Sequence, residues 1–152
     1  MTIRPARPED KEEVIALVTT ILKKEFPADS AAYAADDLER LVESYRPPKN
    51  LFLVAQADRR IVGTCGVKHE SSQTAILRRL FVETHHRRQG IGHRLLHQAL
   101  EFCRTRGFKE VVIRTSASMD QAVRLCRELG FQEDGSWALG GVTLVRFRLQ
   151  LP

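Results

Sequence analysis

The sequence has 152 residues, of which 43% are hydrophobic and 28% charged, and its formal net charge is +5. This length suits one domain with a single hydrophobic core, and the composition excludes a disordered or repetitive chain. No apolar run is long enough to cross a membrane and no hydrophobic leader follows Met1, so neither a membrane partner nor a secretory signal is expected. The positive charge favours anionic partners, either nucleic acid or a phosphorylated cofactor.

The cysteines Cys65, Cys103 and Cys126 are widely separated and include no C-x-x-C pair. An odd number of isolated cysteines does not form a disulfide framework, and it lacks the ligand spacing of a structural zinc site. Because free thiols are typical of reducing compartments, the sequence predicts a cytoplasmic protein without a bound metal.

The first third of the chain predicts one strand and two helices. Residues 2–6 are typical of a short strand, and Pro8 with the acids after it begins a helix that ends near Phe26. A second helix, capped by Asp29 or Ser30, continues to a pair of prolines. The expected buried faces are Val14, Leu17, Val18, Ile21 and Leu22 in the first helix, and Leu38, Leu41, Val42 and Tyr45 in the second.

The middle of the chain predicts three strands and a helix. Residues 51–67 have the pattern of a hairpin whose strands join at residues 57–60, and TAILRRLFV, residues 74–82, forms the next strand. From Gly90 onward the apolar spacing becomes helical, and this helix ends at a cation followed by Gly107.

The end of the chain predicts a buried strand, FKEVVIRT, at residues 108–115, and a shorter helix at residues 119–129. Two strands follow, split by Gly140 and Gly141. The element order is therefore β-α-α-β-β-β-α-β-α-β-β, without a linker or a repeat. We expect one α/β or α+β domain that includes the whole chain and surrounds a mixed sheet.

The stretch HHRRQGIGHRLL, residues 85–96, is both basic and glycine-rich and opens a helix. The backbone N–H groups of Gln89 to Arg94 would be unpaired at the helix start, where the dipole adds about half a positive charge. A phosphate group would satisfy them, and Gly90 and Gly92 would let it approach the backbone closely. The stretch matches neither a Walker loop nor the dinucleotide-binding pattern. It is either another kind of phosphate-binding loop or a solvated basic turn.

Residues 87–92, RRQGIG, match the pattern Arg/Gln-x-x-Gly-x-Gly/Ala, and AVRLCRELGF at residues 122–131 is similar to a helix carrying A-x-x-L-[Tyr]-x-x-x-G-F. Together these stretches resemble the two signatures of the GNAT superfamily of N-acetyltransferases. The predicted element order is also that of this family, and the resemblance covers essentially the whole chain. It implies a mixed, mostly antiparallel central sheet with a splayed cleft, flanked by about four helices.

The resemblance also implies the partners and the reaction. The cosubstrate is acetyl-coenzyme A (acetyl-CoA), the acceptor is a primary amine of a small molecule or peptide, and the amine attacks the thioester directly without a metal. The strand at residues 74–82 is expected to pair with the pantetheine arm, and the thioester lies beside Arg114 in the cleft. A homodimer stays open. The implied cofactor-binding residues are Leu80, Phe81, Val82, Arg87, Arg88, Gln89, Gly90, Ile91, Gly92, His93, Arg94 and Thr115.

Three positions depart from the family pattern. Cys126 stands where many members have the tyrosine that protonates the leaving thiolate, and a cysteine there is equally suited to core packing. Met119 replaces a common asparagine, and Ile76 stands where several members have a glutamate. No single residue therefore stands out as the general base that would deprotonate the amine, and a chain of water molecules is an alternative to a side chain. The candidate bases are Glu70, Glu83, His69 and Glu25.

Two other functions stay open. A non-catalytic acyl-CoA-binding module would share the cofactor site, whereas a basic nucleic-acid-binding domain would use the arginines, although interleaved aromatic residues are absent. His93 and His97 have metal-ligand spacing but fall on the predicted solvated face. Asp36, Asp37 and Glu39 either attract a cationic acceptor or form an ordinary charged helix face.

Overall fold

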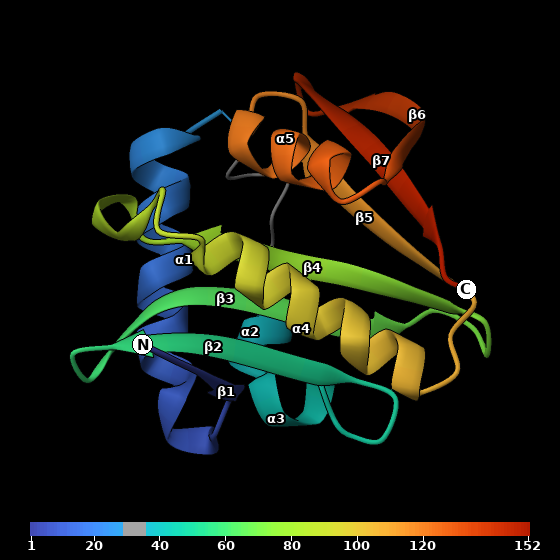
Figure 1. The fold of residues 1–152 in the computed structure, drawn as a ribbon. Coiled ribbons are helices and arrows are strands. Elements are labelled where there is room, and N and C mark those ends of the chain that lie inside the picture. Colours follow the sequence, from blue (N-terminus) through green and yellow to red (C-terminus); the bar gives the residue numbers. More distant parts are fainter. Residues whose placement is uncertain (29–35) are drawn as a thin grey trace.

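The computed structural model describes residues 1–28 and 36–152, and Figure 1 shows how their elements are arranged. The strands are β1 (Thr2–Pro5), β2 (Leu51–Ala57), β3 (Arg60–His69), β4 (Thr74–Val82), β5 (Glu110–Ser116), β6 (Gln132–Leu139) and β7 (Val142–Gln150). The helices are α1 (Lys11–Glu25), α2 (Asp36–Glu39), α3 (Leu41–Ser44), α4 (Ile91–Thr105) and α5 (Asp120–Glu128), with short 3-10 helices at Pro8–Asp10 and Thr84–His86.

All seven strands form one sheet in the order β1-β2-β3-β4-β5-β7-β6. Every neighbouring pair is antiparallel except β4 and β5, which are parallel. A parallel pair needs a crossover connection, and α4 supplies it here. The predicted mixed, mostly antiparallel sheet is confirmed.

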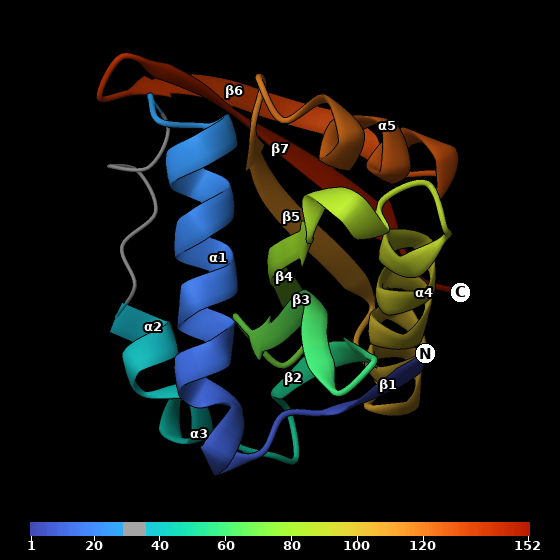
Figure 2. The same cartoon turned by 90° about the vertical axis from the view of Figure 1, so that its left-hand side faces the viewer.

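Helices cover both faces of the sheet, as Figure 2 shows from the side. On one face α4 contacts β2, β3 and β4, and its side chains Leu95, Leu96 and Ala99 are fully buried. Burying a leucine side chain contributes about 1.5–3 kcal/mol, so the apolar face of α4 is a main source of stability. On the other face α1 packs Val14 and Val18 into a second core cluster that includes α2 and α3.

The prediction of one continuous second helix is wrong. Its expected cap, at residues 29–30, lies outside the described residues. The described part consists of two four-residue helices, α2 and α3, which are separated at Arg40 because its backbone is not helical (φ −116°, ψ 51°). This break changes the helical phase, and Val42, predicted to be buried, is 44% exposed. The positions that are buried as predicted are Leu38, Leu41 and Tyr45.

The hairpin and the next strand match the prediction closely. The β2–β3 turn consists of Asp58 and Arg59, both with positive φ (51° and 65°), which suits a tight turn between twisted strands. The TAILRRLFV strand is β4 from its first residue to its last. At the end of α4, Gly107 has a φ of +83°, as expected of the residue that follows a helix.

Candidate active site

The sheet opens between β4 and β5. The two strands pair only along Thr74 to Leu77 of β4. Beyond that point β4 follows β3 to Val82, whereas β5 follows β7 to Ser116, and Figure 1 shows the two strands diverging. Within the described residues, the β4 edge that faces β5 has no strand partner from Arg78 onward. The carbonyl groups of Arg79 and Val82 accept hydrogen bonds from Thr64 and Arg87, so the remaining main-chain groups of this edge are those that can pair with an extended ligand. The predicted splayed cleft is therefore present.

The loop at the open end of β4 leads directly into α4. Gly90 is the N-cap residue of α4 with a φ of +79°, and a Cβ there would meet no atom within 4 Å. No side chain of the described residues caps this helix, and its first turn has no acid. Arg88, His93 and Arg94 are instead exposed around it. A helix start is normally stabilised by negative charge, so this one is suited to bind an anion.

Gly92 lies where α4 approaches both β4 and α5. A Cβ at this position would be 3.6 Å from Cγ2 of Val82 and 3.5 Å from Cδ2 of Leu125. These are ordinary contact distances, so packing alone does not require glycine at position 92. The absence of a side chain leaves the backbone of the first turn accessible between Val82 and α5. Ile91, by contrast, is buried and anchors the helix start in the core.

Arg87 connects the loop to the end of α1. Its guanidinium donates hydrogen bonds to both carboxylate oxygens of Glu25 and, at 3.0 Å, to the carbonyl oxygen of Val82. Partial burial raises the pKa of Glu25, but the hydrogen bonds from Arg87 and Thr84 outweigh it, and the net pKa is below the ordinary value. Arg87 therefore positions the loop, and its contact with a cofactor stays a prediction.

A buried ion pair behind the cleft is the functional feature that sequence reasoning missed. The Arg79 guanidinium donates to Asp37 on α2, with Nη2 2.6 Å from Oδ1 and Nε 3.2 Å from Oδ2. Tyr45 donates its hydroxyl to the same carboxylate at 2.6 Å. The two charged side chains are only 3% and 8% exposed. Regular alternation would put the two adjacent arginines of β4 on opposite faces of the sheet. At Arg79, however, the backbone has a φ of +58° and the β3–β4 register shifts, so Arg78 and Arg79 both lie on the face opposite α4.

This ion pair corrects the expectation for the acids of α2. Burial raises the pKa of Asp37, but the hydrogen bonds from Arg79 and Tyr45 lower it more, so the carboxylate is ionised. Because it is already bound to these partners, Asp37 is not free to attract a cationic acceptor. Asp36 and Glu39 are exposed on the surface of α2.

Residues 15–131 match the family model described as the Acetyltransferase (GNAT) family. The chain belongs to this family. It is 31% identical to human N-acetyltransferase 8 and 33% identical to rat N-acetylaspartate synthetase, each over 128 residues. These alignments cover 76% and 72% of this chain, and 56% and 43% of those proteins. The chain thus spans about half the length of these curated relatives.

Solved structures share the GNAT fold with this chain. A GNAT acetyltransferase from Staphylococcus aureus Mu50 has a TM-score of 0.84 at 22% identity, covering 99% of both chains. An acetyltransferase from Salmonella typhimurium, solved with its cofactor acetyl-CoA, has a TM-score of 0.82 at 18% identity. That likeness covers 99% of this chain and 94% of the Salmonella chain.

The GNAT acid position is occupied by Cys126, which has no exposed surface and lies in the core cluster with the apolar side of α4. Burial raises the pKa of its thiol to about 12. The thiol therefore keeps its proton at neutral pH but has no exposed path to the cleft. This placement favours core packing, and an acid role stays an untested prediction. Nearby, Thr115 is buried and its hydroxyl donates to Sδ of Met119 at 3.5 Å.

The candidate bases lie at opposite ends of β4. At the open end, Glu83 accepts a hydrogen bond from the backbone of His85 at 3.0 Å and lies 2.6 Å from Nδ1 of His86, and the His86 contact lowers its pKa. A lowered pKa makes Glu83 a weaker base. At the paired end, Glu70 is exposed in the β3–β4 turn, and His69 contacts Oδ1 of Asn50 at 2.9 Å.

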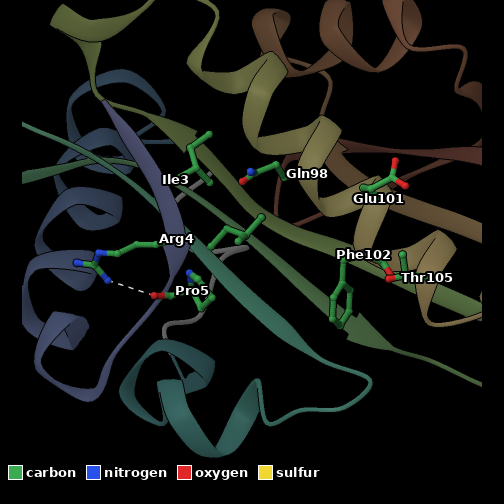
Figure 3. Close-up of a pocket in the computed structure, with 8 residues that line it drawn as sticks. Ile3, Arg4, Pro5, Gln98, Glu101, Phe102 and Thr105 are labelled. Atoms are coloured by element: carbon green, nitrogen blue, oxygen red, sulfur yellow. Dashed lines mark hydrogen bonds between the residues drawn. The ribbon is translucent and has the colours of Figure 1, made fainter.

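Two surface hollows flank different parts of the sheet. One, of about 330 Å³, lies between β1 and the second half of α4, and its lining includes Ile3 and Pro5 on one side and Gln98 and Phe102 on the other (Figure 3). It is at the β1 edge of the sheet, away from the β4–β5 opening, and plays no part in this site. The other, of about 200 Å³, runs along β5 on the face opposite α4.

Within residues 1–28 and 36–152, no helix is long and apolar enough to span a membrane. The same residues contain no group of three or more histidine, cysteine or acidic side chains arranged to hold a metal ion. His93 and His97 are both exposed on α4.

Proposed function

We propose that this chain is an N-acetyltransferase that transfers the acetyl group of acetyl-CoA to a primary amine. The observation that carries the proposal is the continuity of two binding elements. The unpaired edge of β4, from Arg78 to Val82, ends next to the open, uncapped start of α4 at Gly90. A pantetheine arm needs an extended edge with free main-chain groups, and a diphosphate needs exposed N–H groups and positive charge. The β4 edge offers the first of these and the start of α4 offers the second, in the same order as the two parts of the ligand.

The residues present fit this cosubstrate. The β4 main chain would pair with the amide groups of the pantetheine arm, and the N–H groups of the α4 start would hold the diphosphate with help from Arg88. Gly90 fits because the space before it is open. When bound, acetyl-CoA supplies an activated thioester at the opening of the sheet.

The chain's own part in the reaction is to orient the amine and to handle protons. The amine nitrogen forms a bond to the carbonyl carbon, the carbon–sulfur bond breaks, the nitrogen loses a proton and the departing thiolate gains one. The described carboxylates near the opening, Glu25 and Glu83, have lowered pKa values. We therefore assign both proton transfers to water, with orientation in the cleft supplying most of the acceleration.

The relatives support this proposal. One is named an N-acetyltransferase and the other an N-acetylaspartate synthetase. The three described cysteines are free and buried, which supports a reducing, cytoplasmic location.

The first test compares glycines at the two ends of α4. Gly90 and Gly107 both have positive φ (79° and 83°), and a Cβ at either would meet nothing within 4 Å. Acetyl-CoA should raise the melting temperature of the wild type by mass action, by an amount that grows with ligand concentration. Gly90→Asp should abolish this rise because it puts a negative charge before the helix start, whereas Gly107→Asp should keep it. Each variant is measured against its own ligand-free melting temperature. An equal rise in both variants would remove the loop from the cofactor site.

A further inference from the structure

Arg114 and Arg146 lie side by side next to the point where the sheet opens, and Arg78 is the first residue of β4 beyond the segment that pairs with β5. Arg114 and Arg146 are directly opposite each other in the β5–β7 pair. Ile76 pairs with Val112 across β4 and β5, and Arg78 and Arg114 each follow two positions later. Because strand side chains alternate, all three arginines lie on the face opposite α4.

Two of these arginines form no ion pair within the described residues, although the charge of Arg78 also acts on the Asp37 carboxylate. Within the described residues, neither Arg78 nor Arg114 has an acidic group within 4.0 Å, and Arg114 is exposed. Arg146 donates to the carbonyl oxygen of Asp134 at 3.0 Å and lies 3.5 Å from its carboxylate. One step further from the opening, Arg148 is neutralised by Glu110 at 2.5 Å and by Asp134 at 2.6 Å. Among the described arginines of β5 and β7, Arg114 is therefore the one without an ionic partner, and it lies at the opening.

The arrangement of Arg114 opposite Arg146 is unfavourable for folding by itself, because like charges directly opposite across two strands destabilise a sheet. A bound anion would remove this repulsion. Each guanidinium presents a planar set of donors that matches the two oxygens of a carboxylate.

A cavity of about 200 Å³ lies in front of Arg114 and Arg146. Arg114 and Arg146 line one part of it, and Glu70 and Ser71 of the β3–β4 turn border its other end. The ion pair of Glu110 and Arg148 also lines the cavity. The loop proposed to hold the diphosphate precedes α4 on the opposite face of the sheet. A second substrate therefore reaches the opening from the cavity side.

We propose that Arg78, Arg114 and Arg146 form a subsite for a carboxylate, and that the acceptor is a small amine carrying such a group, as an amino acid does. This inference rests on the proposed N-acetyltransferase function. The carboxylate would bind at the arginines, and the amine would then point into the gap between β4 and β5. Electrostatic attraction would also concentrate anionic acceptors at the cavity.

The test compares free amino acids with their amides as acceptors, following release of the coenzyme A thiol. The amide lacks the carboxylate, and its amine is less basic and thus more often neutral, so a preference for the acid cannot come from amine reactivity. The wild type should prefer the acid in kcat/KM. In Arg114→Gln and Arg146→Gln this preference should fall roughly tenfold to hundredfold, as expected for loss of a charge-assisted hydrogen bond. Arg60→Gln, at an exposed position at the start of β3, should keep the wild-type ratio.

A binding measurement makes the test independent of turnover. Succinate, which has carboxylates but no amine, should raise the melting temperature of the chain in the presence of coenzyme A, and neutral succinamide should not. Arg114→Gln should lose most of the succinate effect. Its own melting temperature without ligand should equal or exceed that of the wild type, because a repulsion is removed. A purely structural arginine would give the opposite shift.

The outcomes separate the two proposals. Equal use of acids and amides, or a succinate effect that Arg114→Gln leaves unchanged, would overturn the carboxylate subsite while leaving acetyl transfer intact. Failure of every amine to release thiol would contradict the proposed function, and the succinate measurement would still decide the subsite.

Discussion

Cys126 stands at the position where the family resemblance predicts an acid, and its surroundings favour core packing instead. The thiol is fully buried, and Cys103 on α4 shares both this burial and a pKa raised to about 12. Two buried thiols in one core cluster behave as small apolar groups. A leaving thiolate at the opening would therefore receive its proton from water.

This view predicts the behaviour of two matched variants. Cys126→Ala and Cys103→Ala should each lower the free energy of unfolding by about 1 kcal/mol, because each leaves a small gap in the core. The kcat per folded molecule should stay level in both. Denaturant unfolding and initial rates measure the two quantities. A drop of about one to two decades in kcat for Cys126→Ala alone would instead identify its thiol as the acid.

At the scale of elements, the ion pair of Arg79 and Asp37 attaches α2 to the strand that borders the opening. Arg79 has a positive φ of 58° and sits where the β3–β4 register shifts between Thr64 and Gly66. A left-handed backbone is costly for arginine. The carbonyl of Arg79 accepts a hydrogen bond from Thr64 at 2.7 Å, and its side chain is held by Asp37. The irregular part of β4 is thus held in place through both the main-chain carbonyl and the side chain of Arg79.

Asp37→Asn should lower the free energy of unfolding by about 3 kcal/mol or more, because it leaves the Arg79 charge buried without its partner. Asp36→Asn, at the exposed neighbouring position on α2, should change it by less than about 0.5 kcal/mol. The pKa of Asp37 is lowered in the folded chain, so its contribution is present above the ordinary aspartate pKa of about 4 and is lost as the pH falls below it. The gap between wild type and Asp37→Asn should therefore shrink in acid. Similar losses in both variants would exclude a stabilising ion pair.

For the whole molecule, local patterns predicted most of the fold, whereas contacts distant in sequence were out of reach. The apolar residues of α4 and β4 have clear helical and strand periodicity, so the boundaries of both elements could be predicted from the sequence. The break at Arg40 could not be predicted from periodicity. Leu38 before the break and Leu41 and Tyr45 after it keep the spacing of one continuous helix. The position of the glycine loop directly before α4 was predictable because its sequence pattern is local, whereas its binding of a diphosphate stays a prediction. The pairing of Arg79 with Asp37 joins residues 42 positions apart, and the placement of Arg114 opposite Arg146 depends on strand register.

The central claim is that this chain moves an acetyl group from sulfur to nitrogen. Its most direct measurement uses acetyl-CoA with an isotope-labelled acetyl group, a mixture of amino acids and mass spectrometry of the products. We predict that the label appears as an amide on the acceptor nitrogen, with one free coenzyme A thiol formed for each amide. Acetyl-CoA that binds and stays intact, or thiol release without a labelled amide, would contradict the claim and indicate a binding module instead.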